Sequence, residues 1–242
     1  MPFLTRYEDD PSKPSVGSAL KDMAVRAVAP GFLVFGLILA VGFLLVGPLK
    51  SFGVEEEGVN KDLAGGRTST WDTITMLWSH IGNTEYVIGV AVLVALVVWW
   101  RTKQWWYAVV PILAISLQAT IFVIATASIG RPRPEVTHLD PAPPTSSYPS
   151  GHQGASTALY VSFVLMATRI SNPVLRRIVM VLCAIAPVLV GYARLYRGMH
   201  HPSDVAMGAV NGILSALLAW GYLRRDRAGD KAGERVVAQT RA

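Results

Sequence analysis

The sequence predicts an all-α membrane protein: a six-transmembrane helical bundle whose candidate site lies at the outer membrane–water interface. Hydrophobic residues make up 52% of the 242 residues, and the mean hydropathy is +0.39. Only 16% of the residues are charged, well below the proportion of about a quarter that soluble domains show. Several uncharged stretches also approach the length of about 20 residues that a membrane-spanning helix needs.

Six apolar stretches are candidate spans. We interpret the first, Ala27–Leu49, as a transmembrane helix because it is longer than the apolar part of a signal peptide, about 7–15 residues. The remaining five are Tyr86–Trp100 with an extension towards Thr84, Gln104–Gly130, His152–Thr168, Ile178–Ala193 and Val205–Leu223. Residues 27–223 then form one membrane domain between tails at 1–26 and 224–242. We expect the second tail to be disordered, because it is charged and nearly free of aromatic residues.

The basic residues predict the orientation of this bundle. Most of the 22 Lys and Arg residues lie in the two tails and in the turns around Arg101 and Arg176. Segments rich in Lys and Arg stay in the cytoplasm, so we expect both termini inside. The loops at about 50–83, 130–151 and 194–204 would then face the periplasm or exterior. Because topology accounts for the net charge of +6, we expect no nucleic-acid partner.

The outer loop at 50–83 contains few features that predict structure. The stretch GVNKDLAGGRTS (58–69) is typical of turns. The stretch TWDTITMLWSHIG (70–82) has helix-like spacing and is expected to lie along the interface. We interpret the acidic run Glu55–Glu57 as a solvated surface. Cys183 is the single cysteine, so an intrachain disulfide is excluded.

The other two outer loops carry residues suited to phosphoryl chemistry. One contains GRPRP (130–134) and PSGH (149–152), and the other contains ARLYRGMHHPSD (193–204). An even number of spans separates these loops, so they meet on one side of the membrane. Arginine forks bind phosphate bidentately, and histidine exchanges protons near neutral pH. The loops together supply Arg131, Arg133, His152, Arg194, Arg197, His200, His201 and Asp204.

Local patterns suggest how these residues act. Ser150 and Gly151 precede a predicted helix whose first N–H groups have no intrahelical partner, which is a natural anion site. His200 and Asp204 are four residues apart and face one side of a helix that begins near Pro202. The carboxylate can fix one ring N–H and leave the other ring nitrogen as a nucleophile.

Each motif alone has a plainer explanation. PSGH would also suit a turn with a helix cap, RPRP a stiff basic loop, and Asp204 a helix N-cap. A metal site made of His152, His200 and His201 is a further alternative. We consider it weaker, because the adjacent His200 and His201 would point in different directions from a helix start.

These residues resemble the type 2 phosphatidic acid phosphatase superfamily, the integral-membrane lipid phosphate phosphatases, in its bacterial form. The family pattern has three parts: Lys-x6-Arg-Pro, Pro-Ser-Gly-His and Ser-Arg-x5-His-x3-Asp. The second part is intact at 149–152, and the third is present as Arg194, His200 and Asp204, with Ala193 in place of the serine. In the first part Arg133 matches, but the lysine position is Thr126.

The resemblance implies a role for each matching residue. His200 would attack phosphorus and form a phosphohistidine, Asp204 would orient His200, and His152 would act as acid and then as base. The phosphoryl oxygens would be held by Arg133, Arg194, Ser150 and Gly151. Arg131 is our candidate for replacing the charge lost at Thr126. This scheme needs no metal and no cofactor.

The resemblance also implies an activity. The expected function is hydrolysis of a membrane lipid phosphate or pyrophosphate on the extracytoplasmic face. Candidate substrates are isoprenyl pyrophosphate, isoprenyl-phosphoribose phosphate, phosphatidylglycerol phosphate and phosphatidic acid. Two alternatives remain: a lipid phosphotransferase with the same histidine chemistry, and a non-catalytic lipid-binding or transport protein. The intact His152, His200 and Asp204 argue against the second alternative.

Overall fold

The computed structural model describes residues 14–223, and every regular element in that range is helical. The tail at 224–242, which we expected to be disordered, lies outside the described residues. In chain order the elements are α1 Val16–Met23, the π-helical turn η1 Ala24–Val28, α2 Ala29–Val46, α3 Lys50–Gly65, α4 Ser69–His80, α5 Thr84–Thr102, α6 Trp105–Ala108, α7 Val110–Ile129, α8 Gly151–Ala167, α9 Pro173–Tyr196 and α10 Pro202–Gly221.

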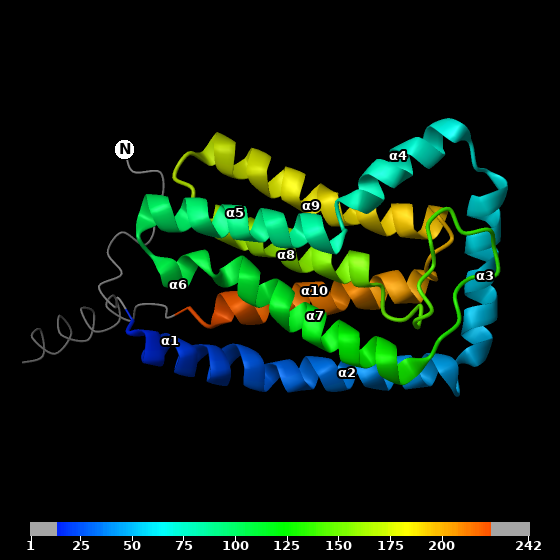
Figure 1. Cartoon of the computed structure of the whole chain (residues 1–242), viewed down its shortest axis with the longest axis horizontal. Helices are drawn as coiled ribbons and strands as arrows, with labels where there is room; N and C mark the ends of the chain where they lie inside the picture. Colours follow the sequence, from blue (N-terminus) through cyan, green and yellow to red (C-terminus); the bar gives the residue numbers. More distant parts are fainter. Residues whose placement is uncertain (1–13, 224–242) are drawn as a thin grey trace, which may run out of the picture.

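The predicted helical membrane bundle is confirmed. By length and composition, five helical stretches in the described range are able to cross a membrane: Val16–Val46, Thr84–Thr102, Trp105–Ile129, Pro173–Tyr196 and Pro202–Gly221. The remaining predicted span, His152–Thr168, corresponds to α8, which has only 17 residues. It packs among α7, α9 and α10, so its neighbours bury much of it (Figure 1).

The first helix begins earlier than predicted, at Val16 instead of Ala27. The hydroxyl of Ser15 caps it by accepting from the N–H of Ser18 at 3.2 Å. The charged residues that made this stretch look like a tail are accommodated on the helix surface, where Asp22 and Arg26 lie 3.7 Å apart one turn from each other. The predicted boundary marked the last charge and not the start of the helix.

Close packing of α8 on α10 fixes the centre of the bundle. The α10 sequence contains Gly208 and Gly212, a spacing that lets two helix backbones approach closely in a membrane. A Cβ atom at Gly208 would come within 2.6 Å of the Ser150 carbonyl, and one at Gly212 within 2.6 Å of the Gly154 carbonyl. The Ser150 N–H also donates to the Asp204 carbonyl at 2.9 Å. The starts of α8 and α10 therefore lie side by side.

The segment at 50–83 forms two helices. The helix predicted around 70–82 is present as α4, which packs on α9. The prediction of turns across 58–69 is wrong for most of that stretch, because α3 continues to Gly65. Figure 1 shows α3 lying across one end of the bundle. The motif loops reach the same end, while the α5–α6 and α8–α9 turns lie at the opposite end.

Candidate active site

His200 lies in the loop between α9 and α10 and is 4% exposed. Its ring Nδ1 is 2.7 Å from the carbonyl oxygen of Ser147. Because a carbonyl only accepts, Nδ1 carries the proton, and Nε2 is left with a lone pair. Burial lowers the pKa of His200 well below its ordinary value, and the charge of Arg194 lowers it further. The ring is therefore neutral at neutral pH, as a nitrogen nucleophile has to be.

Asp204 does not make the contact that the sequence predicted. Its carboxylate is 3.9 Å from Nδ1 of His200, too far for a hydrogen bond. It accepts instead from the backbone N–H of His201 at 2.9 Å and faces the His201 ring Nδ1 at 3.1 Å. The Ser147 carbonyl holds the proton on His200, and Asp204 fixes the backbone of the same loop.

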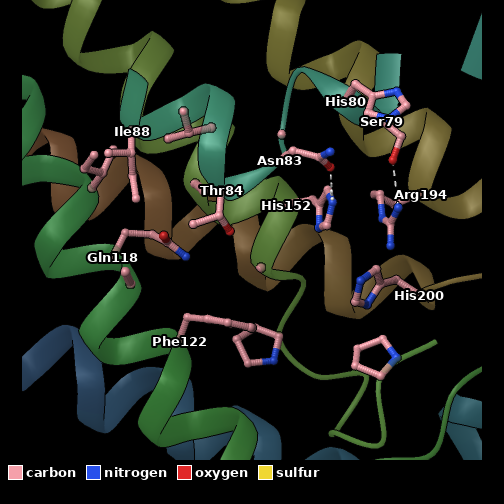
Figure 2. A pocket seen from close by; sticks show the side chains of 18 of the residues that line it. Ser79, His80, Asn83, Thr84, Ile88, Gln118, Phe122, His152, Arg194 and His200 are labelled. Atoms are coloured by element: carbon pink, nitrogen blue, oxygen red, sulfur yellow. Dashed lines mark hydrogen bonds between the residues drawn. The ribbon is translucent and has the colours of Figure 1, made fainter. Parts of the chain in front are cut away.

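His152 is the second residue of α8 and meets a partner that the sequence did not indicate. Its Nε2 is 2.8 Å from the amide oxygen of Asn83, a contact drawn in Figure 2. Asn83 occupies the N-cap position of α5, yet its side chain makes no capping bond. A ring oriented by a fixed third group is the usual arrangement for a general acid or base.

Three buried donors at this site have no hydrogen-bond partner among the described residues: Arg133 Nε, Arg194 Nε and Ser150 Oγ. Both guanidinium groups are held at another nitrogen. Arg133 Nη1 donates to the Met199 carbonyl at 2.7 Å. Burial lowers the pKa of Arg133, and the charge of Asp204 opposes this effect. Desolvated cations with fixed, unfilled donors form a site for an anion.

Arg194 is held more firmly than Arg133. Its Nη1 donates to Ser79 Oγ and to Asp140 Oδ2, both at 2.7 Å. Asp140 also accepts from Nη2 of Arg197 at 2.6 Å. Burial raises the pKa of Asp140, but the Arg197 and Arg194 contacts outweigh it, so that the pKa lies below the ordinary value. Asp140 is thus an ionised anchor for Arg194.

Only one of the two adjacent helix starts is open to a ligand. At α10 the Ser203 N–H donates to Glu56 of α3 at 2.6 Å, and Asp204 caps the same turn. At α8 the Ser150 side chain makes no capping bond. Gly151 packs so closely on Phe122 that a Cβ atom would approach the ring to 2.7 Å. Anions are stabilised at an unfilled helix N-terminus, so α8 is the one that can accept phosphate.

Arg131 lies elsewhere than expected. It is 5% exposed, and its guanidinium donates to Asp204 at 2.6 Å and to Glu56 at 2.8 Å. It is not among the residues that line the cavity described below. The expected contact between Arg131 and phosphate therefore has no support in the geometry. At the lysine position of the family pattern, the Thr126 hydroxyl donates to the Ser146 carbonyl at 3.2 Å.

A cavity of about 690 Å³ joins this site to the membrane-spanning part of the bundle. At one end it is lined by Arg133, His152, Arg194 and His200. It continues between α5 and α7, where its lining includes Val87, Ile88, Val92, Ile112 and Ile115. Figure 2 shows Ile88 and Phe122 on one side and the histidines with Arg194 on the other. Such a cavity suits a molecule with an anionic head and an apolar body.

The sequence model of the PAP2 superfamily matches residues 103–228, which include every motif residue named above. The chain belongs to the PAP2 superfamily. Its relatives include an undecaprenyl-diphosphatase of Sulfolobus acidocaldarius, 28% identical over 77% of this chain and 87% of the relative. Phosphatidylglycerophosphatase B of Bacillus subtilis is 23% identical over 60% of this chain and 71% of the relative.

Two solved structures share the fold. The transmembrane PAP2-type phosphatidylglycerolphosphate phosphatase from Bacillus subtilis superposes with a TM-score of 0.69 at 22% identity, covering 82% of this chain and 98% of that one. Aquifex aeolicus LpxE gives a TM-score of 0.55 at 21% identity, covering 67% of this chain and 92% of that one. At these identities the likeness concerns the fold. It agrees with the multi-pass membrane bundle derived above.

Several residues of the site were missed by reasoning from sequence. Glu56 is 6% exposed and pairs with Arg131, so the interpretation of Glu55–Glu57 as a solvated run is wrong for Glu56, although Glu55 is exposed. Glu57 faces the His201 ring at 3.3 Å. Asn83 and Asp140 carried no motif, and neither had a local signal that reveals a partner far along the chain.

Proposed function

We propose that this PAP2-type lipid phosphatase hydrolyses a membrane lipid phosphate through a phosphohistidine on His200. The observation that carries the proposal is the pair of unfilled donors on Arg133 and Arg194, which line the charged end of an apolar cavity beside a neutral His200. The unfilled hydroxyl of Ser150 is next in the chain to Gly151, which also lines this end. A phosphoryl group spreads negative charge over its oxygens during transfer, and fixed donors stabilise that charge. The cavity between α5 and α7 receives the lipid tail.

The reaction has two steps. Nε2 of His200 forms a bond to phosphorus as the bond from phosphorus to the lipid oxygen breaks. The leaving oxygen takes a proton from His152. Water then gives a proton to His152 and attacks phosphorus, the P–N bond breaks, and the electron pair returns to Nε2. The products are inorganic phosphate, the lipid alcohol and the starting form of both histidines.

The site faces away from the cytoplasm in this proposal. The basic residues Arg101 and Lys103 lie at the C-terminal end of α5, and Arg177 lies near the start of α9, at the end of the bundle opposite the site. The positive-inside rule assigns that end to the cytoplasm. The phosphate would then be released into the periplasm or exterior, and the lipid alcohol would stay in the outer leaflet.

The test is phosphate release in detergent from a panel of lipid phosphates. We expect turnover by the wild type, none by His200→Ala, and a loss of about 10²–10⁴-fold in His152→Ala, the usual magnitude of acid–base catalysis. Rapid quenching with a substrate labelled in its phosphate should leave acid-labile label on wild-type protein only. Vanadate should inhibit and a chelator should not. Wild-type turnover in His200→Ala would exclude this mechanism.

A further inference from the structure

Gln118 is a buried amide in the wall of the cavity, about halfway along α7. The side chain is 2% exposed, and its backbone carbonyl accepts from Asn211 at 3.1 Å. Among the described residues nothing pairs with its side-chain amide. Figure 2 shows that amide pointing into the cavity beneath Thr84. Because the amide borders the cavity, a molecule that fills the cavity excludes water from it. Such a molecule has to supply a hydrogen bond in place of water, since an unpaired desolvated amide costs about 1–3 kcal/mol.

The surrounding backbone fixes the position of this amide. A Cβ atom at Gly154 would come within 2.2 Å of Gln118 Nε2, so only glycine there leaves room for the side chain. Gly154 lies about one turn into α8 from Gly151, and Gln118 lies about one turn along α7 from Phe122, which packs on Gly151. At a rise of 1.5 Å per residue, the two routes place the amide roughly 4.5–6 Å deeper in the membrane than the phosphate-binding end.

The cavity lining changes in character with depth. The residues nearest the helix starts are charged or titratable. Beyond them the lining includes neutral polar residues among apolar ones, namely Thr84, Ser116 and Gln118. The deepest are aliphatic, including Val92 and Ile112. The lining therefore has a charged, a polar and an aliphatic zone. An isoprenoid phosphate has no polar group to match the middle zone, because its phosphate is followed directly by a hydrocarbon.

A diacylglycerol phosphate has the matching order of groups. Its ester carbonyls follow the phosphorus after about five bonds of roughly 1.5 Å, which spans about 6 Å when the bond angles are included. They are followed by acyl chains. A diphosphate would instead place its second charged group in the neutral zone, because Arg133 and Arg194 are the only Lys or Arg residues lining the cavity in the described chain. An anion there would lie in a desolvated place without a cation.

We propose that Gln118 is a specificity-determining residue that donates from Nε2 to an ester carbonyl of a diacylglycerol phosphate monoester. Thr84 of α5 faces the same space from the opposite wall and offers a second donor (Figure 2). This inference rests on the proposed function, because it concerns the lipid cleaved at His200. The substrate class follows from the middle zone, where the donors on Gln118 and Thr84 require acceptors such as ester carbonyls.

The experiment compares two substrates that differ in one group. One is a diacylglycerol phosphate, and the other is the dialkyl ether analogue of the same chain length, which lacks both carbonyls. A polyprenyl monophosphate and a polyprenyl diphosphate complete the panel. For the wild type we expect kcat/KM to favour the ester over the ether by about 10-fold or more, equivalent to about 1.4 kcal/mol. Gln118→Leu and Gln118→Met should remove that preference, with the loss confined to the ester substrate.

Thr120→Val is the matched control. It also replaces a polar residue of α7 by an apolar one, but the Thr120 hydroxyl bonds back to the Ser116 carbonyl and does not line the cavity. It should keep the ester preference. An equal loss on all substrates in both Gln118 variants would show a structural role and overturn the inference. So would a wild type that prefers the polyprenyl diphosphate. Failure of the wild type to release phosphate from any lipid would instead contradict the proposed function.

Discussion

Arg131 and Asp204 form a buried ion pair, with Nη1 of the arginine 2.6 Å from Oδ1 of the carboxylate. The two residues are 73 positions apart and are 5% and 0% exposed at their side chains. Glu56 shares the same guanidinium at 2.8 Å from the other side. The three charges join α3, the loop before α8 and the start of α10. This cluster holds the loop that carries His200 in place from the side away from the cavity. We therefore expect it to stabilise the fold and not to bind substrate.

Removal of Arg131 should therefore destabilise the protein. Arg131→Leu leaves two buried carboxylates without a cation, and breaking a buried pair typically costs about 3–5 kcal/mol. We expect a lower Tm in detergent, with activity lost in proportion to unfolding. Thr126→Lys should restore neither, because a lysine at that place does not face Asp204 or Glu56. A folded Arg131→Leu protein with unchanged Tm and a raised KM that Thr126→Lys corrects would support direct phosphate binding instead.

Asp140 should act as a positioning residue for Arg194. Asp140→Asn weakens the charge-assisted contact that holds Nη1 of Arg194, so kcat/KM should fall by roughly 10-fold, and vanadate should bind correspondingly more weakly. Asp140→Glu should recover part of the loss. The control is Asp72→Asn, which alters a carboxylate that accepts from Tyr196 at 3.1 Å and does not touch Arg194. Equal effects of the two substitutions on vanadate binding would contradict this role.

The lowered pKa of His200 predicts how the protein responds to acid. The unfolded chain takes up a proton at His200 near its ordinary pKa of 6.5, whereas the folded protein does so only at a lower pH. The stabilisation is complete above pH 6.5 and declines as the pH falls below it, by up to about 1.4 kcal/mol per pH unit. The difference in Tm between wild type and His200→Asn should therefore shrink below pH 6.5. A difference in Tm that is constant from pH 8 to pH 5 would exclude this contribution of His200 to stability.

Activity should follow the same titration. Because His200 stays neutral below pH 6.5, the acid limb of kcat/KM that belongs to this group should have an apparent pKa below that of a free histidine. Two phosphate monoesters whose own second pKa values differ would separate the two effects, because a limb that belongs to His200 stays at the same pH and a limb from substrate ionisation moves with the substrate.

Labelling with a membrane-impermeant thiol reagent tests the orientation. In a Cys183→Ala background, Ala142→Cys places an exposed thiol beside the site and Arg177→Cys places one at the opposite end of the bundle. Intact cells should label only Ala142→Cys, and permeabilised cells should label both. Labelling of Arg177→Cys alone in intact cells would reverse the topology.

The sequence predicted what depends on local pattern. Apolar stretches predicted the spans, the parity of those spans predicted that the two motif loops share one end, and small residues in α10 allowed the close packing that joins them. What it could not predict were pairings between distant charges. Glu56 and Ser203 are 147 positions apart, and nothing near Glu56 distinguishes it from a surface glutamate. The predicted start of the first helix was also wrong, because it was based on the charged residues alone. Asp22 and Arg26 form an ion pair on the surface of that helix and do not interrupt it.

The specificity of Gln118 and the orientation of His152 by Asn83 have a common reason for being missed. Both side chains matter because of where α5, α7 and α8 place them relative to one cavity. A single amide inside an apolar stretch does not change the hydrophobic pattern of that stretch. The role of Gln118 can be inferred only from the structure, where Gly154 of α8 lies opposite its side chain.

The place of α10 has a consequence for how the protein is made. It is synthesised after every other helix that the structure describes, yet α2, α3, α7, α8 and α9 all pack against it. Until it is inserted, Glu56 and Arg131 lack the groups on Ser203 and Asp204 that complete their pairing, and His200 has no fixed loop. A chain whose synthesis stops before α10 would contain most of the membrane spans but would have no catalytic activity. Biosynthesis therefore delays the assembly of a working phosphatase until α10 is in the membrane.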